Sequence, residues 1–348
     1  MPKKPSLSYK TSGVDVAATD KAKKDMAKAL ETNDTRVLNS IGAFASLYDA
    51  SFPDYDHPVL VLKTEEPGSK QKIAAQYRRM DGVCQDMINH LINDIAVMGA
   101  TPLSVQDAVI TAKADPQALN DIVAAISAAC KAQGCVLTGG ETSIQPGVVE
   151  PGVFILTASI VGVVEKSKII DGSTIRPGDT VLAIPSNGLH TNGYSLVRKL
   201  MEENPSILDK SVEGDTFLDA ILRPHLCYYQ GLKNIFDHPS LHGLAHITGG
   251  GIEGNLNRIL PKGTAAVIDK ESIRIPPIFR IIQEEGNVPE DDMLKTFNMG
   301  VGLTIVTDPK GAADLQMILR DAGFDSYPIG KIVEGEQTVT YSGKALQW

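Results

Sequence analysis

Strand-like and helix-like segments alternate along this 348-residue chain, and this alternation restricts its fold more than any other feature. Apolar runs of strand length are separated by segments whose apolar residues recur at helical spacing. We expect strands at 58–62, 103–110, 153–164, 180–184, 265–268, 301–306 and 331–333. We expect helices at 82–98, 116–133, 194–202, 277–285 and 309–322. The pattern predicts a fold of the α/β or α+β class.

The chain is longer than a usual single domain of about 100 to 200 residues, so we expect two domains. Turn residues gather between 166 and 179, where Asp171-Gly172 and Pro177-Gly178-Asp179 separate apolar segments. We place the boundary there, with an N-terminal domain at 1–168 and a C-terminal domain at 169–348.

Composition excludes several classes of protein. The chain has no apolar run of about 18 residues and no secretory pattern at its start, so we expect a cytoplasmic protein without a membrane partner. Its four cysteines lack C-x-x-C spacing, which argues against a zinc site or a disulfide framework. The net charge of −9 disfavours nucleic-acid binding. The lysines of 21–28 fit the solvated face of an amphipathic helix.

The most informative loop follows the expected strand at 180–184 and reads Pro-Ser-Asn-Gly-Leu-His-Thr-Asn-Gly-Tyr-Ser. Its glycines permit a tight turn, and we expect Asn192 to cap the helix that begins at Tyr194. Free N–H groups at a helix N-terminus can hold an anion, and His190 could add a proton relay. The alternative is an ordinary turn that carries a surface histidine.

Three acidic residues are candidates for binding a hard cation. Asp94 lies along an otherwise apolar helical stripe, Asp107 lies inside an expected strand, and Glu141 follows two glycines in an expected loop. Magnesium prefers a few carboxylates together with water and phosphate oxygens. The alternatives are a solvated carboxylate for Asp94 and a paired one in the sheet for Asp107. A lone histidine is more often packed than a ligand, so His90 is left out.

Many short motifs in a fixed order resemble the phosphoribosylformylglycinamidine cyclo-ligase (aminoimidazole ribonucleotide synthetase) family. Besides the loop at 185–199, the matching segments are Ser8-Tyr9-Lys10, Gly13-Val14-Asp15, Asn93-Asp94, Gly99-Ala100, Gly139-Gly140-Glu141-Thr142, Pro146-Gly147, Gly162–Ser167, Ile169–Gly172, His246–Gly251, Phe297-Asn298 and Gly300-Val301-Gly302. The resemblance covers nearly the whole chain.

The resemblance implies a fold, an activity and an assembly. The expected fold is a ferredoxin-like first domain of βαββαβ type, whose sheet forms the core of a homodimer, and a larger α/β second domain. The expected activity is ATP-dependent ring closure of a small-molecule substrate, formylglycinamidine ribonucleotide, in purine biosynthesis. ATP and Mg²⁺ are the implied cofactors, and the sequence leaves a requirement for K⁺ open.

The resemblance also assigns roles to residues. His190 and Asp94 are the expected catalytic residues. The expected nucleotide-binding residues are Thr64, Glu65, Gly68, Lys70, Asn93, Gly139 and Gly140. The expected substrate-binding residues are Thr191, Asn192, Ser195, Thr248, Gly249, Gly250 and Asn298. The expected metal ligands are Glu65, Asp94, Asp107 and Glu141.

One segment departs from the family pattern. Family members usually have Thr-Asp-Gly-Val-Gly-Thr-Lys where this chain has Thr64-Glu-Glu-Pro-Gly-Ser-Lys70. Pro67 supplies no N–H donor, and the carboxylate of Glu66 is unfavourable beside a polyphosphate. We expect Glu65 still to reach the metal and Lys70 to contact phosphate.

Two other functions stay open. Relatives in the same superfamily phosphorylate other oxygens or acids, among them selenophosphate synthetase, thiamine monophosphate kinase, a hydrogenase maturation protein and formylglycinamide ribonucleotide amidotransferase. The altered loop also leaves room for a non-catalytic dimer that binds nucleotide as a sensor or scaffold.

Overall fold

The computed structural model describes Met26 and residues 30–39 and 43–348. The motifs near positions 8–15 and, apart from Met26, the helix expected at 21–28 lie outside the described residues. The chain divides into two compact units. Unit 1 contains the described residues up to Asp54, together with Leu62–Leu91 and Pro102–Val161. Unit 2 contains Tyr55–Val61, Ile92–Thr101 and Gly162–Trp348.

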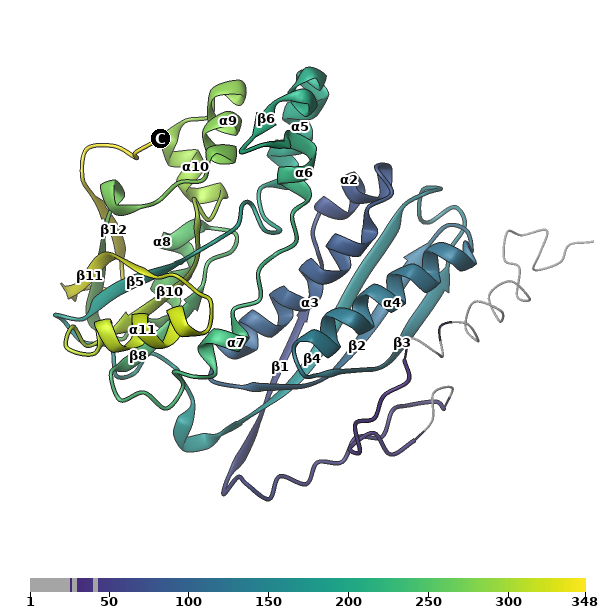
Figure 1. The fold of residues 1–348 in the computed structure, drawn as a ribbon, viewed down its shortest axis with the longest axis horizontal. Coiled ribbons are helices and arrows are strands. Elements are labelled where there is room, and N and C mark those ends of the chain that lie inside the picture. Colours follow the sequence, from purple (N-terminus) through teal and green to yellow (C-terminus); the bar gives the residue numbers. More distant parts are fainter. Residues whose placement is uncertain (1–25, 27–29, 40–42) are drawn as a thin grey trace, which may run out of the picture. The chain divides into compact units, whose positions relative to one another are not determined.

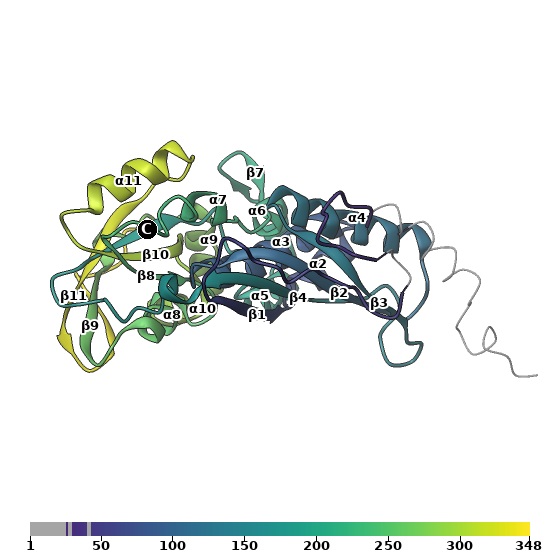
Figure 2. The same ribbon diagram turned by 90° about the horizontal axis from the view of Figure 1, so that it is seen from below.

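The first half of the described chain forms a four-stranded sheet with the strand order β1-β4-β2-β3. Its elements are β1 (Pro58–Glu65), α2 (Lys70–Gln76), α3 (Met80–Ala96), β2 (Thr101–Thr111), α4 (Pro116–Ala132), β3 (Val136–Ile144) and β4 (Phe154–Glu165). Figures 1 and 2 show α3 and α4 on the same face of this sheet. Helix α4 begins where Asp115 accepts a hydrogen bond from the N–H of Ala118, with proline at the first helical position.

The order of these elements differs from the βαββαβ order that the resemblance implies. Strands β2 and β3 run parallel, and α4 connects them. A parallel pair needs a crossover connection, which α4 supplies between β2 and β3. Helices also lie between β1 and β2, whereas no helix lies between β3 and β4. The mixed α and β content is as predicted.

The second half contains a six-stranded sheet with the order β12-β9-β11-β5-β10-β8. Its strands are β5 (Thr180–Pro185), β8 (Leu241–His246), β9 (Gly263–Asp269), β10 (Val301–Thr307), β11 (Tyr327–Gly335) and β12 (Val339–Ser342), and β6 (Ser211–Val212) and β7 (Asp215–Thr216) form a separate pair. Its helices are α5 (Tyr194–Glu203), α6 (Phe217–Leu222), α7 (Tyr229–Leu232), α8 (Gly251–Leu256), α9 (Pro277–Gly286), α10 (Glu290–Thr296) and α11 (Ala312–Asp321). Short 3-10 turns lie at Lys166–Lys168, Pro205–Asp209, Asn257–Ile259 and Lys270–Ser272. Helices α8 and α11 lie on opposite faces of the six-stranded sheet (Figures 1 and 2).

The interior strand β10, between β5 and β8, decides where the loops of unit 2 meet. All seven residues of β10 are buried, and the strand runs antiparallel to both β5 and β8. Val301 pairs with Pro185 of β5, and Leu303 pairs with His246 of β8. Three loops therefore lie at the same end of the strands: the loop after β5, the loop after β8 and the loop before β10.

Three local predictions are wrong. The helix expected from Pro309 begins at Ala312, because the carboxylate of Asp308 accepts the N–H of Lys310 and holds a turn there. Asn192 does not cap α5, since Gly193 occupies that position with φ of 80°. Glu141 lies within β3 and not in a loop, because the pairing of β2 with β3 continues as far as Ile144. None of the helices in the described residues is long and apolar enough to span a membrane.

Candidate active site

Asn298 joins two of the three loops that lie at this end of the six-stranded sheet. Its Oδ1 accepts hydrogen bonds from the hydroxyl of Ser186 (3.0 Å) and the N–H of Gly300 (2.9 Å). Its Nδ2 donates to the carbonyl of Gly188 at 2.9 Å. The predicted substrate-binding Asn298 thus holds the loop after β5 against the loop before β10.

His190, in the loop after β5, is buried and does not lie on the surface. The side chain is 2% exposed, and the backbone adopts φ of 59°, which is uncommon for residues other than glycine. Its ring stacks on that of His225 with centroids 3.8 Å apart. A Cβ on Gly302 would lie 1.8 Å from the Tyr228 hydroxyl oxygen and 3.0 Å from the His190 ring, so only glycine fits there. The alternative of a surface histidine is therefore wrong.

The loop after β8 is held by Asn255 of α8. The Asn255 Nδ2 donates to the carbonyls of Gly249 (3.2 Å) and Gly251 (2.8 Å), and its Oδ1 accepts from the Thr248 hydroxyl (3.2 Å). A Cβ on Gly249 would lie 3.0 Å from Asn192 Oδ1, so the loops after β5 and β8 approach each other closely. The predicted substrate residues Asn192, Thr248 and Gly249 are brought together.

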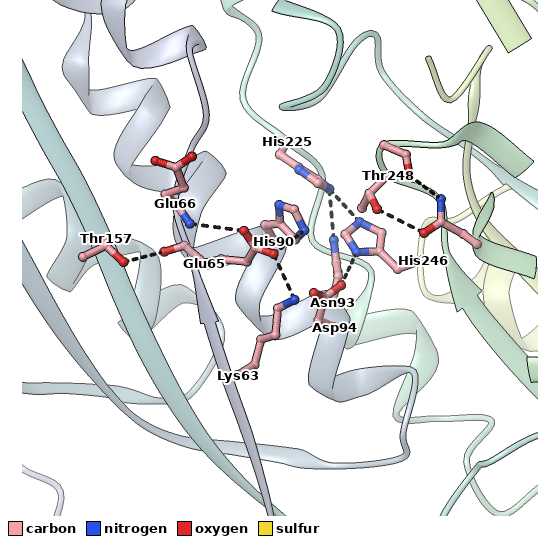
Figure 3. Close-up of polar contacts among 12 residues, drawn as sticks. Lys63, Glu65, Glu66, His90, Asn93, Asp94, Thr157, His225, His246 and Thr248 are labelled. Carbon is pink, nitrogen blue, oxygen red and sulfur yellow. Dashed lines mark hydrogen bonds and ion pairs between the residues drawn. The ribbon is translucent and has the colours of Figure 1, made fainter. Parts of the chain in front are cut away.

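The last turn of α3 brings Asn93 and Asp94, both in unit 2, against two histidines (Figure 3). Asp94 Oδ1 lies 2.7 Å from His246 Nδ1. His246 Nε2 lies 3.0 Å from His225 Nε2, which in turn lies 3.3 Å from Asn93 Nδ2. The structure therefore pairs the predicted catalytic Asp94 with a buried histidine.

A cavity of about 360 Å³ opens beside the loop after β5, lined by Ser186, Asn187, Glu213, Arg223, Arg274 and residues 275–277. Both of its arginines already have carboxylate partners. Arg223 pairs with Asp215 at 2.7 Å, and Arg274 pairs with Asp325 at 2.8 Å. Each guanidinium therefore shares its charge with a carboxylate.

In unit 1, Glu65 of the altered segment has several polar partners, most of them outside that segment (Figure 3). The Glu65 carboxylate lies 2.9 Å from Lys63 Nζ and 3.7 Å from His90 Nε2, and it accepts the N–H of Glu66. The hydroxyl of Thr157 on β4 donates to the Glu65 carbonyl at 3.1 Å. Glu65 is thus oriented by neighbours on two strands and one helix.

Lys70 lies deeper than the sequence suggests. The side chains of Lys70 and Asp86 are both fully buried, and Lys70 Nζ lies 2.8 Å from Asp86 Oδ2. Burial lowers the pKa of the Lys70 ammonium, while the Asp86 carboxylate opposes that shift. A contact between Lys70 and a phosphate would require this pair to open.

Asp107 and Gly140 face each other on the parallel strands β2 and β3. Asp107 is 9% exposed, and burial raises the pKa of its carboxyl group to about 7. A Cβ on Gly140 would lie 1.9 Å from Asp107 Oδ1, so the glycine makes room for the carboxylate. Gly139, with φ of 155°, and the exposed Glu141 flank this position on β3. A desolvated carboxylate of this kind is a suitable ligand for a hard cation.

The remaining predicted residues lie next to the loops of unit 2 or in the altered segment of unit 1. Thr191 and Ser195 lie on either side of Asn192 at the start of α5, and Gly250, with φ of 93°, lies at the start of α8. Gly68, with φ of 64°, precedes α2. The Thr64 hydroxyl lies 2.7 Å from the Ser159 hydroxyl. Sequence reasoning missed His225, Tyr228 and Asp86. His225 and Tyr228 lie in an irregular segment with no periodic signal, and only the apolar surroundings of Asp86 on α3 indicated a buried charge.

Comparison with known proteins identifies the family of the chain. Residues 49–164 match the model of the AIR synthase related protein N-terminal domain, and residues 176–342 match that of the C-terminal domain. The chain is 42% identical to the phosphoribosylformylglycinamidine cyclo-ligase of Chromobacterium violaceum, with 94% of this chain and 96% of that protein covered. It is 39% identical to the protein of the same name from Cupriavidus pinatubonensis, with 94% of each covered.

Solved structures with low sequence identity share the fold. HypE from E. coli superposes with a TM-score of 0.69 at 17% identity, over 94% of this chain and 96% of that one. Thiamine-monophosphate kinase from Stenotrophomonas maltophilia K279a gives a TM-score of 0.64 at 17% identity, over 93% and 96%. From the two domain matches and the near full-length identity to cyclo-ligases, the chain belongs to the AIR synthase related family and groups with its phosphoribosylformylglycinamidine cyclo-ligases.

Proposed function

We propose that this protein is an ATP-dependent cyclo-ligase that converts formylglycinamidine ribonucleotide to aminoimidazole ribonucleotide, with release of ADP and phosphate. The observation that carries the proposal is the 42% identity to a phosphoribosylformylglycinamidine cyclo-ligase over 94% of the chain. The buried His190 and the linked loops of unit 2 are consistent with it. The low-identity structural neighbours support only the fold.

The reaction needs an activated amide oxygen. That oxygen is a poor leaving group, so it first attacks the γ-phosphorus of ATP, and ADP leaves. The neighbouring amidine nitrogen then adds to the same carbon, and the C–O bond breaks as phosphate departs and the imidazole ring closes. Each step transfers charge or a proton, so the protein contributes through positioning and electrostatics.

Residue roles follow from chemistry and placement. We assign His190 to proton transfer or phosphate orientation, since an imidazole titrates near neutrality. The loops joined by Asn298 and Asn255 are proposed to hold the ribonucleotide. Glu65, Asp107, Glu141 and Asp94 stay predicted Mg²⁺ ligands, and Asp94 also stays a predicted catalytic residue. Magnesium, when bound, neutralises the charge of the nucleotide phosphates.

The domain boundary near residue 168 and the cytoplasmic location stay our proposals. The two family models support the boundary, because one ends at residue 164 and the other begins at residue 176.

The altered segment offers the sharpest test of nucleotide binding. We expect Glu65→Ala to weaken ATP binding at least tenfold, about 1.4 kcal/mol, in the presence of Mg²⁺ and to change it little in EDTA. The physical reason is that the Glu65 carboxylate, oriented by Lys63 and His90, is a proposed metal ligand. Isothermal titration calorimetry with ATP measures both affinities.

The matched control is Glu66→Ala, which removes the neighbouring exposed carboxylate and keeps the backbone N–H that contacts Glu65. We expect this variant to bind Mg²⁺ and ATP at least as tightly as the parent protein. Equal affinities for the parent and the Glu65→Ala variant would remove Glu65 from the metal site.

A further inference from the structure

His225 contacts two other buried histidines of unit 2, His190 and His246. It lies in the irregular segment between α6 and α7 and is 1% exposed. Its Nε2 lies 3.0 Å from His246 Nε2, and its ring lies parallel to that of His190 within 18°. No sequence motif identified it, and the proposed reaction does not assign it a role.

The hydrogen bonds around His225 define its orientation. Asn93 Oδ1 accepts the N–H of Tyr228 (2.8 Å), and Asn93 Nδ2 donates to the Leu226 carbonyl (2.8 Å), so both amide atoms are identified by their partners. The Asn93 Nδ2 then also faces His225 Nε2 at 3.3 Å. The segment that carries His225 is therefore held to α3 through backbone groups on its C-terminal side.

The contact with Asp94 sets the tautomer of His246. A carboxylate oxygen only accepts, so the contact of 2.7 Å requires a hydrogen on His246 Nδ1 that points at Asp94. His246 Nε2 must then share a hydrogen with His225 Nε2 across 3.0 Å. Asp94, His246 and His225 form a hydrogen-bonded chain that ends in the stack with His190.

The three histidines also resemble a metal site, because their ring nitrogens lie within 4.8 Å of one another. The stack argues against that interpretation. A metal bound by imidazole lies in the plane of the ring at about 2.0–2.1 Å from nitrogen. An ion midway between rings stacked at 3.8 Å would lie about 1.9 Å out of both planes, almost the full length of the bond.

We propose that His225 is a positioning residue: its Nε2 holds the rotamer of His246, whose tautomer Asp94 sets, and its ring face holds the imidazole of His190. The effect on turnover rests on the proposed function, whereas the effect on the two imidazoles does not. The two contacts can be separated by substitution. His225→Phe keeps a ring against His190 and removes Nε2, and His225→Gln keeps a polar atom near the Nε2 position and removes the ring.

The first experiment is histidine-selective ¹⁵N NMR of the full-length protein without substrate, at one pH. We expect His225→Phe to shift the ring ¹⁵N signals of His246 and His225→Gln to shift those of His190. The control is His242→Gln, which changes a buried histidine that pairs with Asp179 at 2.7 Å and lies at the other end of β8. It should leave both sets of signals in place. Unshifted signals in both His225 variants, or equal shifts in the control, would overturn the proposal.

The second experiment measures turnover. We expect both His225 variants to lower kcat about tenfold or more with KM for ATP within about twofold, and His242→Gln to leave kcat unchanged. In a His190→Ala background, His225→Gln should have no further effect, because its ring acts through His190. Full additivity in that cycle would contradict the positioning role. Shifted NMR signals in a protein whose parent form shows no cyclisation would refute the proposed function and leave the positioning role standing.

Discussion

At the scale of single residues, the carboxylate of Asp107 packs directly against Gly140 in unit 1. The pair Gly139-Gly140 was predicted to approach a nucleotide, and the structure adds a packing reason for the second glycine. The Asp107 carboxylate occupies the space that a side chain at position 140 would need. This arrangement keeps a charged group desolvated on the sheet, where a cation or a proton must compensate it.

The raised pKa of Asp107 predicts how stability depends on pH in metal-free protein. Burial raises the pKa from 3.8 to about 7, so between these values the folded state holds a proton that the unfolded state releases. Stability therefore falls as pH rises through this window, by up to about 1.4 kcal/mol for each pH unit. We expect Asp107→Asn in EDTA to be several degrees more stable than the parent protein at pH 8 and to lose this advantage at pH 4.

Thermal unfolding of the two proteins at each pH measures the difference. Asp121→Asn, which changes an exposed carboxylate on α4, is the control and should follow the parent protein at every pH. A constant difference in Tm between Asp107→Asn and the parent across this range would contradict the predicted titration.

At the scale of elements, hydrophobic periodicity predicted the long strands and helices and failed where tertiary contacts decide. The strand at 180–184 and the helix at 277–285 match β5 and α9 to within one residue, because their apolar patterns are strong. The start of α5 at Tyr194 matches the prediction, but its cap does not. The cap is Gly193, because a Cβ there would approach the Phe297 ring to 2.1 Å. Short elements such as β6 and β7 carry too few residues to show a period.

The candidate site was predictable in the same uneven way. The glycine-rich loop after the strand at 180–184 identified His190, because backbone turns leave a local signature, whereas Asn298 came from the family resemblance. The partners of these residues come from elsewhere in the chain, as His225 does, and no local pattern reports such a contact. The burial of Lys70 likewise depends on Asp86, sixteen positions away on another helix.

The Lys70–Asp86 pair joins α2 to α3 and should be important for stability. We expect Lys70→Met to lower the free energy of unfolding by about 3–5 kcal/mol, because it leaves the Asp86 carboxylate buried without its ammonium. The double variant Lys70→Met/Asp86→Leu should recover most of this loss, since it removes both charges. Urea unfolding measures each value, with the exposed Lys72→Met as the control. Equal losses in the single and double variants would show that the charge pair is not the cause.

At the scale of the whole molecule, exposed apolar residues on β1 support our proposal of a homodimer. Leu60 and Leu62 are 52% and 69% exposed, and their spacing of two places them on the same face of the strand. Strand β1 is one end of the four-stranded sheet in the described residues. A pair of exposed leucines at a sheet edge is unfavourable in water and suits an interface with a second copy.

We expect Leu60→Lys/Leu62→Lys to weaken the dimer at least tenfold, because each lysine would bring a charge into the interface. Light scattering after size-exclusion chromatography over a range of protein concentrations measures the mass. Met317→Lys changes a residue of similar exposure (55%) on α11 and should leave the mass unchanged. A dimer equally stable in all three proteins would locate the interface elsewhere.

The most direct test of the account is a steady-state assay with ATP, Mg²⁺, K⁺ and formylglycinamidine ribonucleotide that follows ADP and the aminoimidazole product together. We predict equal amounts of both products from the parent protein. His190→Ala should retain the parent Tm within a few degrees and lose about 10²–10⁴-fold in kcat. A folded parent protein that binds ATP and yields neither product would contradict the assignment and favour a non-catalytic nucleotide-binding role.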